Sequence, residues 1–261
     1  REYAQSQVNN QKKDFIRMGV FGDWENPYLS LNRSFEADTI RALGRIIANG
    51  HLEKGEKPVH FCMDCRSALA EAEVEYKDKN SHSIDVKFKV TSKSIDSLCS
   101  SFQITGINEI YFVIWTTTPW TIPSNVAVCI NENIEYVLVK GANEHFIIAK
   151  DLVEACSERW GLELESLGSA LGKDIKDVSM KHPLYPRESR LLHGDHVTTE
   201  SGTGCVHTAP AHGLDDYFIC IKNSLEPVKA LDNRGIFKEE YGRLSGLSTS
   251  KGDPIVIELL E

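Results

Sequence analysis

The stretch IYFVIWTTTPWTIPSN, residues 110–125, places three consecutive threonines directly after an apolar run. The run 110–114 is β-branched and aromatic, and it predicts a buried strand. The threonines follow where that strand should end, and Pro119 and Pro123 break the pattern. Hydroxyls gathered at a strand end indicate a polar site at the edge of a sheet. The alternative is that they are ordinary strand residues forming cross-strand pairs.

Composition limits the classes of protein that fit. The chain has 261 residues, 41% of them hydrophobic, and can bury a substantial core. Its net charge of −9 argues against a surface that grips polyanions as a whole, so any nucleic acid must be contacted locally. The seven cysteines come without a signal peptide or an apolar run of membrane-spanning length. We therefore expect a cytoplasmic location, free thiols and no membrane partner.

Three parts are expected along the chain. Residues 1–58 carry helical spacing of apolar positions, interrupted by GDWENPY at 22–28. Residues 59–76 hold a CxxC knuckle and a connecting strand, and residues 77–261 form a β-rich core. The sequence does not begin with methionine, and its last stretch is apolar. We therefore expect the chain to be a piece of a longer polypeptide.

The core is expected to consist of short strands separated by polar or Gly/Asn turns. Besides the opening stretch, the expected strands are AEVEYKD (72–78), IDVKFKV (84–90), AVCI (127–130), EYVLVK (135–140) and HFIIAK (145–150). Mainly antiparallel strands of this kind suggest a closed or nearly closed barrel. Residues 149–161 predict an amphipathic helix that ends at Gly161. The expected fold class is α+β, a β-barrel-like core with surrounding helices and a helical N-terminal segment.

A second unusual stretch is SGTGCVHTAPAHGLDDY, residues 201–217. Its glycines allow positive φ angles or close approach of a ligand. CVH alternates like a strand, so His207 should face away from Val206. After Pro210 a helix should begin, with Asp215 and Asp216 in its first turn, where acids are also favoured by the helix dipole alone.

Together with HFCMDCRSALAEAEVEY (60–76) and DFIRMGVFGDWENPYL (14–29), these stretches resemble the connective peptide 1 insertion of isoleucyl-tRNA synthetases, their editing domain. The resemblance covers essentially the whole chain. The related valyl and leucyl enzymes typically carry Thr-Thr-Arg-Pro where this chain has Thr-Thr-Pro-Trp, and usually lack a histidine at the position of His207. The isoleucyl assignment depends on TTTPW, His207 and HGLDDY together.

The resemblance implies a post-transfer editing hydrolase of a bacterial-type class I synthetase. Water would attack the aminoacyl ester of valyl-tRNA(Ile) in a pocket too small for isoleucine. The implied partners are the tRNA 3′ end carrying valine and the rest of the parent synthetase, with no cofactor required and a monomeric state. Nucleotide-binding signatures of the parent are absent, so amino acid activation is not expected. The alternative is a non-catalytic module that docks the tRNA 3′ end.

Roles for the catalytic residues follow from the resemblance. Thr116, Thr117 and Thr118 would line the editing pocket with hydroxyls that bond ribose, ester and water. Asp216 would bind the α-ammonium of the substrate. His207 would position the ester and exclude isoleucine by bulk, although its ordinary pKa also permits proton relay.

Substrate-binding residues are expected around this group. Trp120 would shape an apolar slot beside the threonines. Asn125 and the backbone at Gly204 would bind the terminal adenosine. Asp215 would mainly cap the helix that follows Pro210 and contribute weakly to substrate binding. His212 would line the loop before that helix.

Cys62 and Cys65 have the spacing of half a tetrahedral zinc site. One pair is incomplete, because a structural zinc site takes four ligands. In some members of the family the second pair follows the insertion, which implies a structural zinc in the full-length enzyme and none in this chain. A redox CxxC, or an independent zinc or thiol enzyme, is the remaining alternative.

Overall fold

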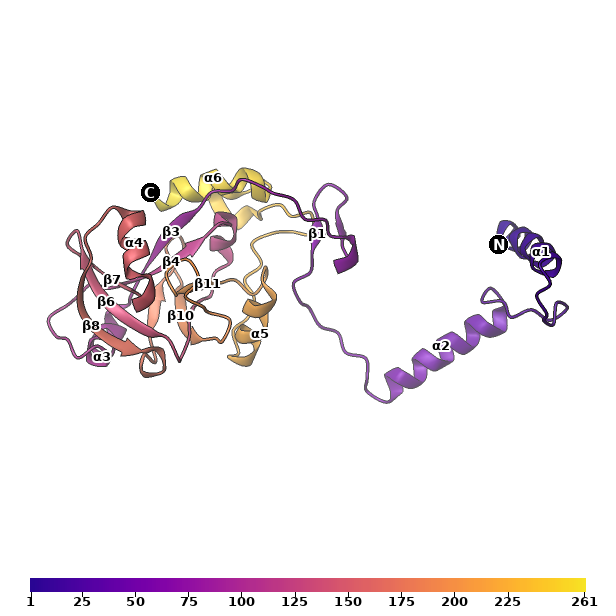
Figure 1. The fold of residues 1–261 in the computed structure, drawn as a ribbon, viewed down its shortest axis with the longest axis horizontal. Helices are drawn as coiled ribbons and strands as arrows, with labels where there is room; N and C mark the ends of the chain where they lie inside the picture. The colour runs from indigo at the N-terminus through magenta and orange to yellow at the C-terminus, as the bar shows by residue number, and fades with distance from the viewer. The chain divides into compact units, whose positions relative to one another are not determined.

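The computed structural model describes residues 1–261 and divides them into two compact units, Arg1–Glu56 and Lys57–Glu261. The expected three-part division stays a prediction. The first unit contains α1 (Glu2–Arg17) and α2 (Arg33–Ala48), separated by the break expected at 22–28 (Figure 1). Neither helix has a buried residue.

The second unit contains two main sheets and a small hairpin (Figure 1). The five-stranded sheet has the order β3-β4-β7-β6-β8, with bounds Ile84–Lys89, Tyr111–Thr116, Glu144–Ala149, Glu135–Gly141 and Glu165–Leu171. The four-stranded sheet has the order β11-β5-β10-β9, with bounds Val206–Thr208, Ala127–Ile130, Glu188–His193 and Ser179–Lys181. The hairpin pairs β1 (Phe61–Cys62) with β2 (Ser67–Ala68).

Most strand pairs are antiparallel, as expected, but β4 pairs with β7 and β5 with β10 in parallel. A bridge between Val90, just after β3, and Met180 of β9 joins the two sheets. The mixed class with a β core is confirmed. The sheets stay open, however, and do not close into a barrel.

Helices of the second unit surround these sheets. They are α3 (Ser92–Ser101), α4 (Val153–Trp160), α5 (Leu214–Lys222) and α6 (Thr249–Leu260), with 3₁₀ turns η1 (Glu71–Glu73), η2 (Pro119–Ser124), η3 (Lys150–Leu152), η4 (Gly172–Asp174) and η5 (Glu239–Leu244). Gly161 ends α4 in the left-handed conformation, which confirms that prediction. No helix is both long and apolar enough to cross a bilayer.

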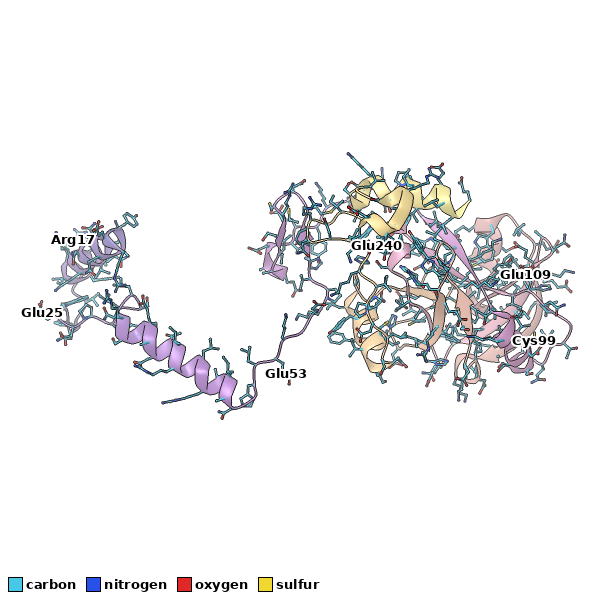
Figure 2. The ribbon with its side chains drawn as sticks, turned by 180° about the vertical axis from the view of Figure 1, so that it is seen from behind. Arg17, Glu25, Glu53, Cys99, Glu109 and Glu240 are labelled. Carbon is cyan, nitrogen blue, oxygen red and sulfur yellow. The ribbon has the colours of Figure 1, made fainter.

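The core lies within the sheets and beneath α3 and α4. Phe88, Phe112 and Ile114 are fully buried there. Cys99 of α3 packs into the same core, whereas Glu109 lies at its surface (Figure 2).

The expected strand at 72–78 is wrong. Its alternation of Val74 and Tyr76 has no partner strand, and Tyr76 is 85% exposed. The structure has the short turn η1 there instead, followed by irregular chain.

Candidate functional site

The threonine run begins inside the sheet and leaves it within two residues. Thr116 is the last residue of β4 and is buried, whereas Thr117 and Thr118 are exposed. The Thr118 N–H donates to Thr116 Oγ1 at 3.1 Å, and the hydroxyl oxygens of Thr116 and Thr118 lie 3.2 Å apart. Thr117 makes no side-chain hydrogen bond within the protein, so its hydroxyl is free for a ligand.

The chain then turns through η2, which starts with Pro119 at a position where proline suits a helix. Thr121 is buried, and its hydroxyl donates to the Thr118 carbonyl at 2.8 Å. The N–H of Trp120 donates to Asp253 Oδ1 of α6 at 2.8 Å. Contacts from a distant helix therefore fix the turn that follows the threonines.

His207 lies on β11, directly opposite Val128 of β5, and both its ring nitrogens have partners. The Asn125 amide Nδ2 lies 2.7 Å from His207 Nδ1, and Thr121 Oγ1 lies 2.9 Å from His207 Nε2. An amide nitrogen only donates, so Nδ1 accepts. The Thr121 proton already goes to a carbonyl, and Nε2–H must therefore donate to Thr121.

This network holds His207 neutral, with its proton on Nε2. Burial, with smaller contributions from the nearby His182 and His212, lowers the pKa of His207 to about 3. An imidazole with both nitrogens engaged has neither a free lone pair nor a free proton to transfer. The geometry favours the expected positioning role over proton relay.

Asp216 lies in the first turn of α5 and reaches back toward the strand that carries His207. Its Oδ2 accepts the Ala209 N–H at 2.9 Å, and its Oδ1 has no partner in the protein. Burial raises the pKa of Asp216, while the Ala209 N–H lowers it. Asp215, the neighbouring acid, is exposed.

One continuous path of contacts joins the predicted catalytic residues. It runs from Thr116 and Thr118 through Thr121 to His207, and from there along β11 to Ala209 and Asp216. The structure brings all of these together except the side chain of Thr117, which lies next to the path but outside its hydrogen bonds.

Two predicted substrate-binding residues are buried. Asn125 is fully inaccessible, and its amide is used by Ala127 O, His207 and the Ser189 hydroxyl. Gly204 is buried at φ +77°, and a Cβ there would overlap Ala149. In this arrangement both residues support the site from behind and do not face a ligand.

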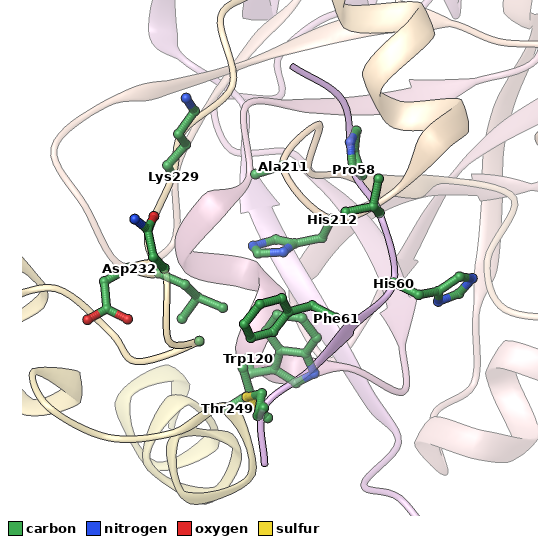
Figure 3. A pocket seen from close by; sticks show the side chains of 14 residues that line it. Pro58, His60, Phe61, Trp120, Ala211, His212, Lys229, Asp232 and Thr249 are labelled. Atoms are coloured by element: carbon green, nitrogen blue, oxygen red, sulfur yellow. The ribbon is translucent and has the colours of Figure 1, made fainter. Parts of the chain in front are cut away.

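A cavity of about 680 Å³ lies beside the path (Figure 3). Trp120 and His212 form part of its wall, with ring centroids 4.8 Å apart in an edge-to-face contact. His212 Nε2 lies 3.0 Å from Ser124 Oγ, and Phe61 and Thr249 complete this side. Thr116, Thr117 and Thr118 do not line this cavity.

Cys62 and Cys65 form a tight knuckle between β1 and β2. The Cys65 N–H lies 3.3 Å from Cys62 Sγ and lowers the pKa of that thiol. No group of three or more His, Cys, Asp or Glu residues in the chain is arranged to hold a metal ion. The residues present therefore do not make a complete tetrahedral zinc site.

Sequence reasoning missed three residues that shape the site, Thr121, Arg187 and Ser189. Thr121 could have been found, because it stands three residues after Thr118 and a tight turn brings such positions together. Arg187 and Ser189 bond to residues 123–125 from more than 60 positions away, and no local signal marks them.

Comparisons with known proteins show the family to which this chain belongs. The family model of class I tRNA synthetases (I, L, M and V) matches residues 1–199. The isoleucine–tRNA ligase of Pasteurella multocida (strain Pm70) is 49% identical over 264 residues, covering 100% of this chain and 28% of the relative. That of Idiomarina loihiensis is 47% identical over 271 residues, covering 100% and 29%. The chain thus spans under a third of the length of these relatives.

Solved structures share the fold at low identity. GlLeuRS-CP1 matches with a TM-score of 0.55 and 16% identity, covering 69% of this chain and 95% of that one. The P. knowlesi cytosolic leucyl-tRNA synthetase editing domain matches with a TM-score of 0.53 and 10% identity, covering 71% and 96%. The chain belongs to the class I tRNA synthetases of the isoleucine, leucine, methionine and valine group, and resembles the editing insertion of isoleucine–tRNA ligases.

Proposed function

We propose that this chain is a post-transfer editing hydrolase that deacylates valyl-tRNA(Ile) by water attack on the aminoacyl ester at the tRNA 3′ end. The observation that carries the proposal is the path of contacts from the threonine hydroxyls through a neutral His207 to Asp216. The path provides a fixed imidazole wall and a carboxylate with an open oxygen, and the free hydroxyl of Thr117 lies next to it.

Asp216 binds the α-ammonium of the attached amino acid. Its Oδ2 is held by the Ala209 N–H, which orients the carboxylate and leaves Oδ1 for the substrate. A charge-assisted hydrogen bond in a partly dry site is stronger than its counterpart in water. The carboxylate must be ionised, so the raised pKa of Asp216 makes binding weaken at acid pH.

His207 forms a wall that limits side-chain size. Its ring is pinned at both nitrogens and cannot swing aside without breaking two hydrogen bonds. Isoleucyl-tRNA synthetases are themselves the standard illustration of why such a second pocket is useful, since one methylene is worth only about 1–3 kcal/mol of discrimination. A rigid ring rejects the longer side chain by overlap.

The threonine hydroxyls hold the ester and the attacking water. Thr117 and Thr118 are exposed, and the buried Thr116 hydroxyl braces Thr118 from behind. Because His207 has no free nitrogen, proton transfer falls to water and to the terminal hydroxyl of the tRNA itself. No metal or other cofactor takes part.

The remaining features of the proposal concern the longer protein. The partners are the tRNA 3′ end carrying valine and the rest of a parent synthetase, and the chain acts as a monomer in the cytoplasm. Cys62 and Cys65 supply half of a structural zinc site that further cysteines of the parent complete.

A deacylation assay with valyl-tRNA(Ile) and isoleucyl-tRNA(Ile) tests the function. Asp216→Asn keeps an oxygen for the Ala209 N–H and removes the charge, so kcat/KM for the valyl ester should fall by about 10- to 150-fold, the equivalent of about 1.5–3 kcal/mol. Asp215→Asn is the matched comparison: Asp215 is exposed and makes no side-chain cap hydrogen bond to α5, contrary to its expected capping role, so this change should lower the rate far less.

The competing function is a docking module without catalysis. It predicts that the wild-type chain binds the tRNA 3′ end but leaves the valyl ester at its spontaneous rate of hydrolysis. Equal rates for Asp216→Asn and Asp215→Asn would likewise count against an editing role for Asp216.

A further inference from the structure

Arg187 is a largely buried cation without a carboxylate partner. Its Nη2 donates to the Pro123 carbonyl at 2.5 Å and to the Asn125 carbonyl at 3.1 Å, and its Nε donates to the Asn125 carbonyl at 3.3 Å. The charged groups that influence its pKa include no acid, and burial lowers that pKa. The charge is instead held by backbone carbonyls and by the Tyr185 ring, whose centroid lies 5.3 Å from the guanidinium carbon, so Arg187 is tied to the turn rather than to an ion pair.

The carbonyls that Arg187 binds are those at the C-terminal end of η2 (Pro119–Ser124). Carbonyls at the end of a helix lack partners within the helix and carry partial negative charge. A guanidinium satisfies them with two N–H groups in a fixed planar arrangement. Arg187 therefore caps the turn that begins with the last threonine of the run.

Two neighbours of Arg187 also form hydrogen bonds to this turn and to Asn125. His182 Nδ1 accepts the N–H groups of Leu184 and Tyr185, which leaves Nε2–H to donate to the Ile122 carbonyl at 3.0 Å. The Ser189 hydroxyl donates to Asn125 Oδ1 at 2.5 Å. We call residues 182–189 the clamp, because they hold three carbonyls and one side chain of residues 122–125.

The Ala127 carbonyl and the clamp together determine which way the Asn125 amide points. Ser189 donates to Oδ1, which requires that oxygen to face the clamp and Nδ2 to face Ala127 and His207. A flipped amide would bring Oδ1 against the Ala127 carbonyl, which puts two acceptors together, and would take from His207 Nδ1 the donor that it meets now. The orientation of Asn125 in turn makes His207 Nδ1 an acceptor and places its proton on Nε2.

We propose that Arg187 is a positioning residue for the editing site, acting through Asn125 to fix the ring orientation and tautomer of His207. The inference rests on the proposed function and adds a residue to it that touches neither substrate nor reacting atoms. Arg187 holds the Asn125 backbone, Ser189 holds its amide, and the amide holds the imidazole.

The experiment uses the full chain with histidine labelled with ¹⁵N. Nitrogen shifts of His207 should show a single neutral Nε2–H tautomer in the wild type. Arg187→Met keeps much of the side-chain length but removes every donor, so a mixture of tautomers should result. Arg190→Met is the matched control, since Arg190 is exposed, lies three residues along and makes no side-chain hydrogen bond.

Kinetics on valyl-tRNA(Ile) provide the second readout. Arg187→Met should lower kcat by roughly tenfold to a hundredfold, the range expected when a site group is displaced by about 1 Å, with KM changed far less. Arg187→Lys keeps the charge but loses the planar set of N–H donors, and should recover only part of kcat. If Arg187→Met fails to fold, Ser189→Ala tests the same contacts to Asn125, because it removes one hydrogen bond and leaves Arg187 in place.

Each result decides the proposal. A single Nε2–H tautomer in both Arg187→Met and Ser189→Ala, with kcat equal to that of Arg190→Met, would overturn it. A wild-type chain that leaves the valyl ester intact would instead refute the proposed function, and the nitrogen spectra would still show whether Arg187 controls His207.

Discussion

Two motifs stand out in this chain, the threonine run with its histidine partner and the Cys62–Cys65 knuckle, and the fold treats them differently. The turn η2, which follows the threonine run, receives contacts from β11, α6 and the clamp, all distant in sequence. The knuckle lies on a two-stranded hairpin whose cysteine contacts are local. Its thiols meet no further ligand group in the chain.

The contrast teaches that spacing alone does not make a site. Both motifs place reactive side chains at the intervals that their chemistry needs. Only the turn after the threonine run and its partner His207 have polar groups oriented by residues distant in sequence, and orientation is what separates a binding arrangement from a set of suitable residues. Substitutions at residues distant in sequence are therefore expected to alter the editing site but not the knuckle.

Acid is expected to produce the largest difference between the two regions. Burial lowers the pKa of His182 and His207 to about 3 and that of His212 to about 4, from a usual 6.5. The unfolded chain thus binds more protons below pH 6.5, and each histidine weakens folding by up to about 1.4 kcal/mol per pH unit.

Urea unfolding at pH 7, 6 and 5 measures this slope. With three neutral histidines in the folded protein, the free energy of unfolding can fall by up to about 4 kcal/mol between pH 6 and 5. Asp216 opposes the trend at more acid pH, because a raised pKa makes the native state bind the extra proton. His207→Gln should reduce the slope of unfolding free energy against pH by the amount that one proton contributes. An unchanged slope would show that His207 is protonated in the folded protein.

A substitution at Gly204 should have the next largest effect. An alanine there meets Ala149 and must adopt φ near +77°, so the free energy of unfolding should fall by about 2–4 kcal/mol. Gly106→Ala is the control, with φ +85° and nothing within 4 Å, and should lose only about 1 kcal/mol. Equal losses would mean that packing against Ala149 contributes nothing.

The knuckle should give the smallest effect. Replacing Cys62 and Cys65 with serine removes only local contacts, so the free energy of unfolding should change by less than about 0.5 kcal/mol. A chelator should leave the wild-type chain equally stable. A loss of several kcal/mol on either treatment would show that the pair binds a metal within this chain.

Much of the fold was predictable because local patterns dominate it. The runs at 84–90, 127–130, 135–140 and 145–150 became β3, β5, β6 and β7, and Gly161 ended α4. The run at 72–78 failed because alternation without a partner strand cannot form a sheet. The helices α3 and α6 were not anticipated, since their patterns are short or carry an internal proline.

The sequence by itself determined which residue types are available, namely hydroxyls at the end of a buried strand, a histidine on a short strand and an acid in the first turn of a helix. The tertiary structure alone decided their states. The proton on His207 Nε2 follows from Asn125 and Thr121, the amide orientation of Asn125 follows from Ala127 and Ser189, and Arg187 holds the Asn125 backbone. Hydrogen-bond direction depends on which groups meet in space, and residues more than 60 positions apart meet only through folding.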